Sequence, residues 1–96
     1  MLQTIIEAIR NRQILTFNYH DYRREVEPHA VGATKDGYDV LLCYQTLGGH
    51  VTLGHDWDFC ELSKIGQLEV TGELFSKARA GYKKIDKGMA IIYAEL

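Results

Sequence analysis

Residues 23–45, with the sequence RREVEPHAVGATKDGYDVLLCYQ, decide the fold of the chain. They contain its only proline, its clearest turn signal and its longest apolar run. The Lys-Asp-Gly triplet at 35–37 predicts a tight hairpin turn, because Asp-Gly readily adopts the positive φ that such a turn requires. A first strand is expected over residues 23–27. Pro28 cannot donate to a β-ladder, so this strand should end or kink there before extended chain resumes.

The second strand of the hairpin is expected over residues 38–45. Alternation along it places large side chains on both faces: Tyr38, Val40, Leu42 and Tyr44 on one, and Leu41 and Cys43 on the other. Apolar groups on both faces indicate a central strand or a strand of a closed barrel. Cys43 and Cys60 both fall in predicted strands, so we expect small buried hydrophobic residues rather than a disulfide.

A helix and further strands flank the hairpin. Helical spacing predicts a helix of about ten residues with an apolar stripe of Leu2, Ile5, Ile6 and Ile9. It begins at Leu2 or is capped by Thr4, and residues 11–12 mark its end. Period-two alternation predicts a strand over residues 14–19. Glycines mark a loop at 46–54, and two more strands are expected over 55–62 and 65–70.

The C-terminal part of the chain is less regular. Residues 75–82 fit a short helix or an irregular loop. Residues 89–96 are too apolar to stay in water, so they should dock on the core or pair with another chain. Helix and strand are nearly balanced there, and the β-branched Ile91 and Ile92 with Tyr93 favour a strand.

These patterns predict one α+β domain over residues 1–96, with a core at 2–70 and a C-terminal extension at 71–96. An N-terminal helix should pack on a small, strongly bent antiparallel sheet of five or six strands, shaped as an SH3/Sm-like barrel. No run approaches the roughly 20 apolar residues of a membrane span, and the start lacks the features of a signal peptide. We therefore expect a cytoplasmic protein without a membrane partner.

Charge is distributed unevenly along a chain whose formal net charge is −2. Residues 36–73 are strongly acidic, whereas residues 74–96 are basic. The basic part could fold over the acidic middle or meet it in a neighbouring subunit. Without an overall basic excess, tight nonspecific binding to DNA is not expected.

The chain resembles the WYL domain family over residues 2 to about 70. Residues 24–29, Arg-Glu-Val-Glu-Pro-His, match the family's arginine, acidic, valine, glutamate, proline pattern. Asp-Val-Leu at 39–41 stands in place of the name-giving triplet. Glu61 stands where the family has its first arginine, and Lys64 keeps the second basic position. The resemblance implies a barrel that serves as a regulatory module in bacterial transcription factors and defence systems, with nucleotide or nucleic-acid ligands.

A ligand pocket is expected from one arginine and three aromatic residues. Arg24 would hold a phosphate while Tyr38, Tyr44 and Trp57 stack on a planar group, and the resemblance adds Lys64. The alternative is that the aromatic residues are core and Arg24 pairs with Glu27 or Asp39.

A second candidate site is a basic stretch with an aromatic residue, a composition that suits single-stranded nucleic acid. Its members are Lys77, Arg79, Tyr82, Lys83 and Lys84. The alternative is a solvated surface, or a contact with the acidic middle of the chain.

Metal binding and catalysis are not expected. The potential metal ligands between residues 50 and 60 lack metal-site spacing and alternate between strand faces, which suggests a solvated acidic edge. They are His50, His55, Asp56, Asp58 and Cys60. No nucleophile-and-base spacing, phosphate loop or metalloprotease motif is present, so neither an enzyme nor a cofactor is predicted.

The sequence therefore favours a non-enzymatic, WYL-like regulatory module that binds a nucleotide or single-stranded nucleic acid. Such a module without its own DNA-reading helix must signal to a protein partner or a second copy. The alternative is an oligomerising structural or protein-interaction domain with a degenerate pocket.

Overall fold

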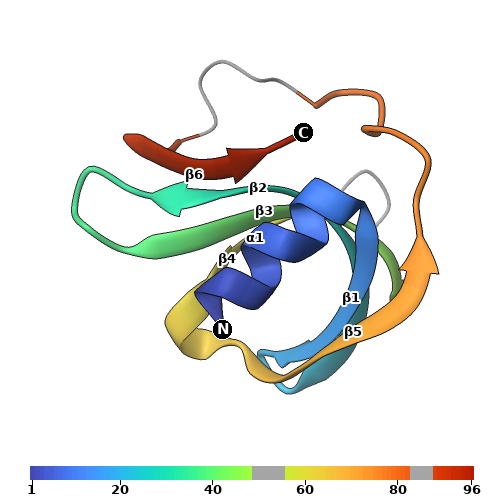
Figure 1. Cartoon of the computed structure of the whole chain (residues 1–96). Coiled ribbons are helices and arrows are strands. Elements are labelled where there is room, and N and C mark those ends of the chain that lie inside the picture. Colours follow the sequence, from blue (N-terminus) through green and yellow to red (C-terminus); the bar gives the residue numbers. More distant parts are fainter. Residues whose placement is uncertain (49–55, 83–87) are drawn as a thin grey trace.

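The predicted hairpin forms the centre of the sheet in the computed structural model. The structure describes residues 1–48, 56–82 and 88–96. The strands of the hairpin are β2 (Tyr22–Ala33) and β3 (Asp39–Gly48), paired antiparallel (Figure 1). At the turn the Gly37 amide donates to the Thr34 carbonyl at 2.9 Å, and Gly37 has φ 89°. The Asp-Gly signal therefore predicted this turn correctly.

Pro28 does not end β2, which continues as one strand of 12 residues. Instead the β2–β3 register shifts between Pro28 and Ala30, so that His29 is an extra residue at this irregularity. On its other edge β2 pairs with two strands in succession. β1 (Gln13–Tyr19) pairs along Tyr22–Val26, and β6 (Ile91–Glu95) pairs along Ala30–Ala33. Pro28, which has no backbone N–H to donate, thus lies where β6 replaces β1 as the neighbour of β2.

The described strands form one antiparallel sheet of six strands in the order β4-β3-β2-β1-β5, with β6 added to β2. β4 is Trp57–Glu61 and β5 is Gly66–Leu74, joined by the short 3₁₀ helix η1 (Leu62–Lys64). β3 lies between two strands, as its apolar residues on both faces predicted. The predicted barrel is not confirmed, because the sheet is open over the described residues and β6 joins β2 instead of closing the ends.

The helix α1 (Leu2–Asn11) packs on one face of the sheet (Figure 1). It buries Ile5, Ala8 and Ile9 against a core to which β1 to β4 contribute. The chain leaves the helix at Arg12, which adopts a left-handed φ of 53°. The α+β prediction is therefore confirmed. No helix among the described residues is long and apolar enough to cross a bilayer.

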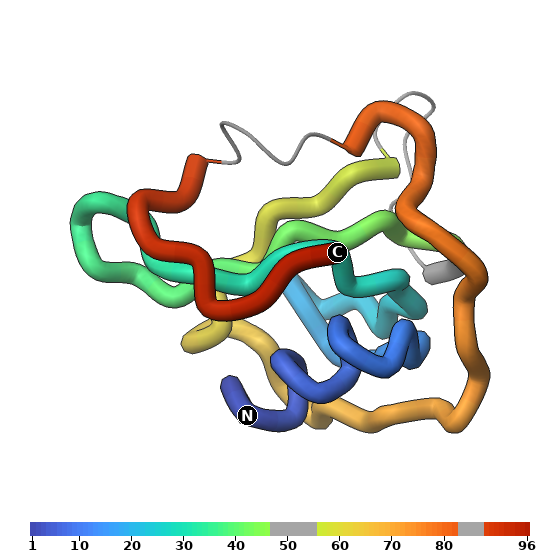
Figure 2. Tube along the Cα trace, turned by 45° about the horizontal axis from the view of Figure 1, so that its top comes forward, coloured from blue at the N-terminus to red at the C-terminus, as the bar shows by residue number. Residues whose placement is uncertain are grey.

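The C-terminal part of the chain has two sections, an irregular segment that crosses the sheet and a last strand that joins it. Residues 75–82 form no helix or strand, and Figure 2 shows them rising from the end of β5 towards the start of β4. The chain then returns as β6 beside β2, which confirms the predicted strand in residues 89–96. The Phe75 amide donates to the Arg12 carbonyl at 2.9 Å where this crossing begins. We call residues 75–82 the C-terminal segment.

Candidate binding site

Three strands place a carboxylate and two aromatic rings side by side on the sheet. Glu27 of β2 lies opposite Tyr44 of β3, which lies opposite Trp57 of β4. These side chains point away from the face that carries the buried Cys43, because side chains alternate along a strand. With His29, they form a surface that we call the aromatic–carboxylate site.

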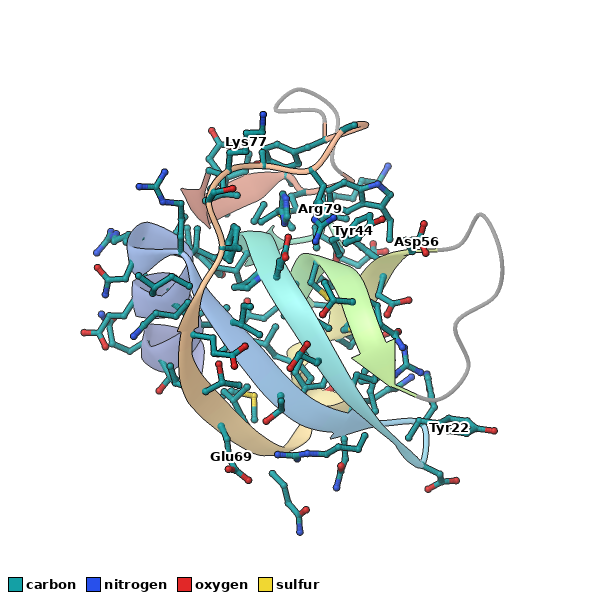
Figure 3. All side chains as sticks on the ribbon, turned by 90° about the vertical axis from the view of Figure 1, so that its right-hand side faces the viewer. Tyr22, Tyr44, Asp56, Glu69, Lys77 and Arg79 are labelled. Carbon is teal, nitrogen blue, oxygen red and sulfur yellow. The ribbon has the colours of Figure 1, made fainter. Side chains whose placement is uncertain are left out.

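Arg79 of the C-terminal segment binds this site through its guanidinium group. Nε donates to Oε1 of Glu27 at 2.8 Å and Nη2 to Oε2 at 2.9 Å, while Cζ lies 4.6 Å from the Tyr44 ring centroid. Figure 3 shows Arg79 beside Tyr44. The Glu27 side chain is only 7% exposed, so it depends on this partner to offset its loss of water. The hydrogen bonds that Arg79 donates to Glu27 raise the pKa of Arg79, and the negative charges of Glu27 and Asp56 act in the same direction.

His29 is completely buried and both of its ring nitrogens are engaged. Nδ1 lies 2.8 Å from the Glu27 carbonyl oxygen, to which it donates, and Nε2 accepts from the Arg79 amide at 3.0 Å. This pair of partners requires the neutral ring with its proton on Nδ1. Burial lowers the pKa of His29 below its ordinary value of 6.5, which keeps the ring neutral.

Aromatic rings complete the contact between the segment and the sheet. Tyr82 stacks on Trp57 with ring centroids 6.1 Å apart, and Phe75 stacks on His29 at 5.7 Å. Trp57 meets Tyr44 and His29 edge to face at 5.3 and 4.8 Å. The Tyr82 hydroxyl donates to the His29 carbonyl at 3.3 Å, and burial is the main cause that raises the pKa of Tyr82 to about 12. Such ring geometries add to the effect of burial alone.

The structure brings together two of the five predicted ligand residues, Tyr44 and Trp57. Arg24 lies on the opposite face of the sheet, where Nη1 binds Asp58 at 3.1 Å and the guanidinium covers the Tyr19 ring at 5.2 Å. The predicted alternative was an ion pair of Arg24 with Glu27 or Asp39. Arg24 does form an ion pair, but with Asp58. The Nε atom of Arg24 is buried without a hydrogen-bond partner.

The other two predicted ligand residues lie elsewhere on the surface. Tyr38 is 58% exposed beside the hairpin turn. Lys64 is half exposed in η1, 3.8 Å from the Glu61 carboxylate, and lines a surface hollow with Tyr19 and Arg23. Over the described residues, the five positions therefore do not form one pocket.

The predicted nucleic-acid set is divided as well. Arg79 and Tyr82 face the aromatic–carboxylate site, whereas Lys77 is exposed. Lys83 and Lys84 lie outside the described residues. Arg79 pairs with Glu27, which lies outside the acidic residues 36–73 of the predicted alternative; of that acidic middle, Asp56 is close enough to raise the pKa of Arg79.

The residues considered as metal ligands have other surroundings. His50 and His55 lie outside the described residues, and Asp58 pairs with Arg24. Among the described residues no group of three or more potential ligands could hold a metal ion. Cys43 and Cys60 are buried free thiols, as predicted. A hydrogen bond with Cys60, followed by burial, raises the pKa of the Cys43 thiol well above its ordinary value.

Sequence reasoning missed Glu27 and His29, which are the polar residues at the centre of the site. Their spacing of two, across a proline in a strand, was the available signal, because residues two apart share a strand face. A carboxylate on the same face as predicted aromatic residues indicates a cationic partner, and Arg79 is that partner here.

Comparison with protein-family models, curated proteins and solved structures found no match to this chain. The resemblance to WYL domains thus gains no support from them and stays a prediction.

Proposed function

We propose that the protein is a non-enzymatic binding module whose ligand replaces the C-terminal segment on the aromatic–carboxylate site. A regulatory role of the kind that the WYL resemblance implies would follow, because ligand binding would release this segment. One observation carries the proposal. Two of the three aromatic residues predicted to bind a ligand, Tyr44 and Trp57, are covered by two residues predicted to bind nucleic acid, Arg79 and Tyr82.

The way in which the C-terminal segment is held supports its replacement by a ligand. The site residues lie on paired strands of the sheet and so belong to a rigid surface. The C-terminal segment forms no ladder with them, and its contacts with the site are mainly side-chain contacts. The Arg79 side chain is 45% exposed and borders a hollow of about 360 Å³ that Glu27 also lines. A ligand could approach the carboxylate through this hollow.

The chemistry of the site favours binding over catalysis. Both nitrogens of His29 and both carboxylate oxygens of Glu27 already have partners within the protein. The Cys43 thiol is buried with a raised pKa, so the reactive thiolate is disfavoured. The Cys43 thiol also lies on the opposite face of the sheet, so the polar groups that hold and orient an occupant are those of His29 and Glu27.

The proposal is tested with the single tryptophan, Trp57, as the reporter. Arg79→Ala should weaken docking and increase acrylamide quenching of Trp57 several-fold, while thermal unfolding stays cooperative. Lys77→Ala, at an exposed position of the same segment, should leave quenching unchanged. Nucleotides, short single strands and peptides are then screened by Trp57 fluorescence, and a ligand should bind Arg79→Ala more tightly than the wild type. If none binds either protein, the module has no ligand at this site and the proposal fails.

A second candidate, an oligomerising interaction domain, is favoured by a different observation. β6 pairs with β2 along one edge, and its Ile91, Ile92 and Tyr93 are 58%, 41% and 37% exposed. Unpaired strand edges readily pair with other chains, and a second copy is the proposed partner. Sedimentation should then give a dimer that Ile91→Lys converts to monomer. A wild-type monomer at high concentration would exclude this candidate.

A further inference from the structure

We infer that the aromatic–carboxylate site recognises an arginine in a peptide segment of a partner protein, with a tyrosine three residues after it. The inference rests on the proposed function and names its ligand class. The resident occupant has this pattern, since Arg79 and Tyr82 are three positions apart. The C-terminal segment is thus an internal competitor of the partner.

The charge of the site selects a cation. The sheet contributes the Glu27 carboxylate, and Asp56 lies close enough to raise the pKa of Arg79. His29 is neutral, because burial lowers its pKa. Among the described site residues, the cation that pairs with Glu27 is Arg79 of the C-terminal segment. Without the segment the site is negative, which disfavours the phosphate of a nucleotide.

The geometry selects a guanidinium over an ammonium group. Two hydrogen bonds of 2.8 and 2.9 Å join separate nitrogens of Arg79 to the two oxygens of Glu27. The same planar group lies over the Tyr44 ring at 4.6 Å. Paired donation combined with stacking needs a flat, forked cation, and the single ammonium nitrogen of lysine cannot provide both.

The remaining contacts select a peptide over a free guanidine compound. His29 Nε2 accepts from the backbone amide of Arg79, and the His29 carbonyl accepts from the Tyr82 hydroxyl. The Tyr82 amide donates to the Arg79 carbonyl at 3.2 Å, so a turn presents both side chains to the sheet. Gly81 in this turn has φ 92°, and an added Cβ would lie 3.4 Å from Trp57 Nε1. The positive φ therefore also favours glycine before the tyrosine.

Competition within the chain fixes the expected affinities. A tethered segment has an effective concentration of about 1 mM, so it masks the site from weaker ligands in solution. Removing its two anchors, as in Arg79→Ala/Tyr82→Ala, should expose the site to a peptide with the sequence of residues 75–82. We expect this peptide to bind the double variant at least about tenfold more tightly than the wild type.

The experiment titrates the protein and its double variant with five probes and follows Trp57 fluorescence. The probes are the 75–82 peptide, its Arg79→Lys and Arg79→Gln versions, and AMP with a short single strand as the phosphate arm. The expected order is the arginine peptide first, the lysine peptide at least about fivefold weaker, and no response to the glutamine peptide or to phosphate. Glu27→Gln in the double variant should abolish peptide binding.

The outcomes separate the inference from the proposed function. Tighter binding of AMP or the single strand than of the peptide overturns the inference but keeps a binding module. Equal binding of the arginine and lysine peptides also overturns the inference. If no probe binds, both fail. If the double variant does not fold, Arg79→Ala is tested with ethylguanidinium against ethylammonium, and only the former should restore protection of Trp57. Failure of Arg79→Ala to fold would contradict an exchangeable segment.

Discussion

His29 couples protonation to the docking of the C-terminal segment. Its neutral ring donates at Nδ1 and accepts at Nε2, so a second proton would oppose the Arg79 amide hydrogen. Burial and the Arg79 charge lower its pKa, against the opposing influence of Glu27, while the pKa in the unfolded chain is near 6.5. Unfolding therefore takes up a proton at acidic pH. The contribution of His29 to stability is complete above pH 6.5 and decreases as pH falls below that value.

We predict that His29 accounts for part of a loss of stability between about pH 7 and about pH 5. Urea unfolding at several pH values, followed by Trp57 fluorescence, should give a free energy of unfolding that decreases with acidity. His29→Gln should flatten this dependence, although it lowers stability overall. His20→Gln, at an exposed histidine, is the control and should keep the wild-type slope. Equal slopes in the wild type and His29→Gln would exclude a role of His29.

Individual residues also mark the limit of sequence reasoning. Tyr44 and Trp57 were predicted as partners, and the sheet register makes them neighbours. Arg24 was placed with them, yet it lies on the opposite face and pairs with Asp58. The alternation within each strand was read correctly. Which face of one strand matches which face of the next depends on register and on the shift after Pro28, and neither has a local signal.

At the scale of the elements, Gly32 is the position on which the docking of β6 depends most directly. A Cβ at Gly32 would collide with the Ile91 backbone carbonyl and would lie 2.9 Å from Met89 Sδ. Backbone cannot move aside as a flexible side chain can. We predict that Gly32→Ala lowers the free energy of unfolding by about 1–3 kcal/mol and reduces hydrogen-exchange protection in β6.

Gly66→Ala provides the matched control for this prediction. Gly66 also lies in a strand, but the nearest atom to an added Cβ is Asn18 Cβ at 4.0 Å, an ordinary contact. Its effect on the free energy of unfolding should stay within about 1 kcal/mol. Equal effects of the two substitutions would mean that β6 does not pack closely on Gly32.

Elements with a local signal were predicted well, and those decided by distant contacts were not. The helix, the hairpin turn and the central strand follow from spacing and turn chemistry within about ten residues. The β-branched residues of β6 favoured a strand, but its pairing with β2 had no signal in the sequence. The irregular course of residues 75–82 depends on Glu27 and His29, which are about 50 residues away along the chain.

On the scale of the whole molecule, the described strands form an open sheet instead of a closed barrel, and β6 of the C-terminal extension joins β2 in the middle of the strand order. β2 has β3 on one edge and shares its other edge between β1 and β6. β4 and β5 then remain at the two ends of the strand order. The uneven charge of the sequence predicted a contact between the basic residues 74–96 and the acidic residues 36–73, but Arg79 pairs with Glu27, which precedes that acidic middle. Local sequence patterns predicted a helix packed on a sheet, but the pairing of strands that are distant in sequence determines that the sheet is open.

The same charge layout predicts weak, salt-sensitive binding to nucleic acid. If all five cationic side chains of residues 74–96 contacted phosphates, log K would fall with log[salt] at a slope of about −3.5 for a single strand. Glu27 neutralises Arg79 and the net charge is −2, so we expect a slope shallower than about −2 for a labelled 12-mer. Glu27→Gln frees the Arg79 guanidinium and should steepen the slope by about 0.7, whereas Glu73→Gln, at an exposed carboxylate, should change it less. A wild-type slope of about −3 or steeper that Glu27→Gln leaves unchanged would mean that Arg79 reaches phosphate despite Glu27, and that the basic stretch binds nucleic acid directly.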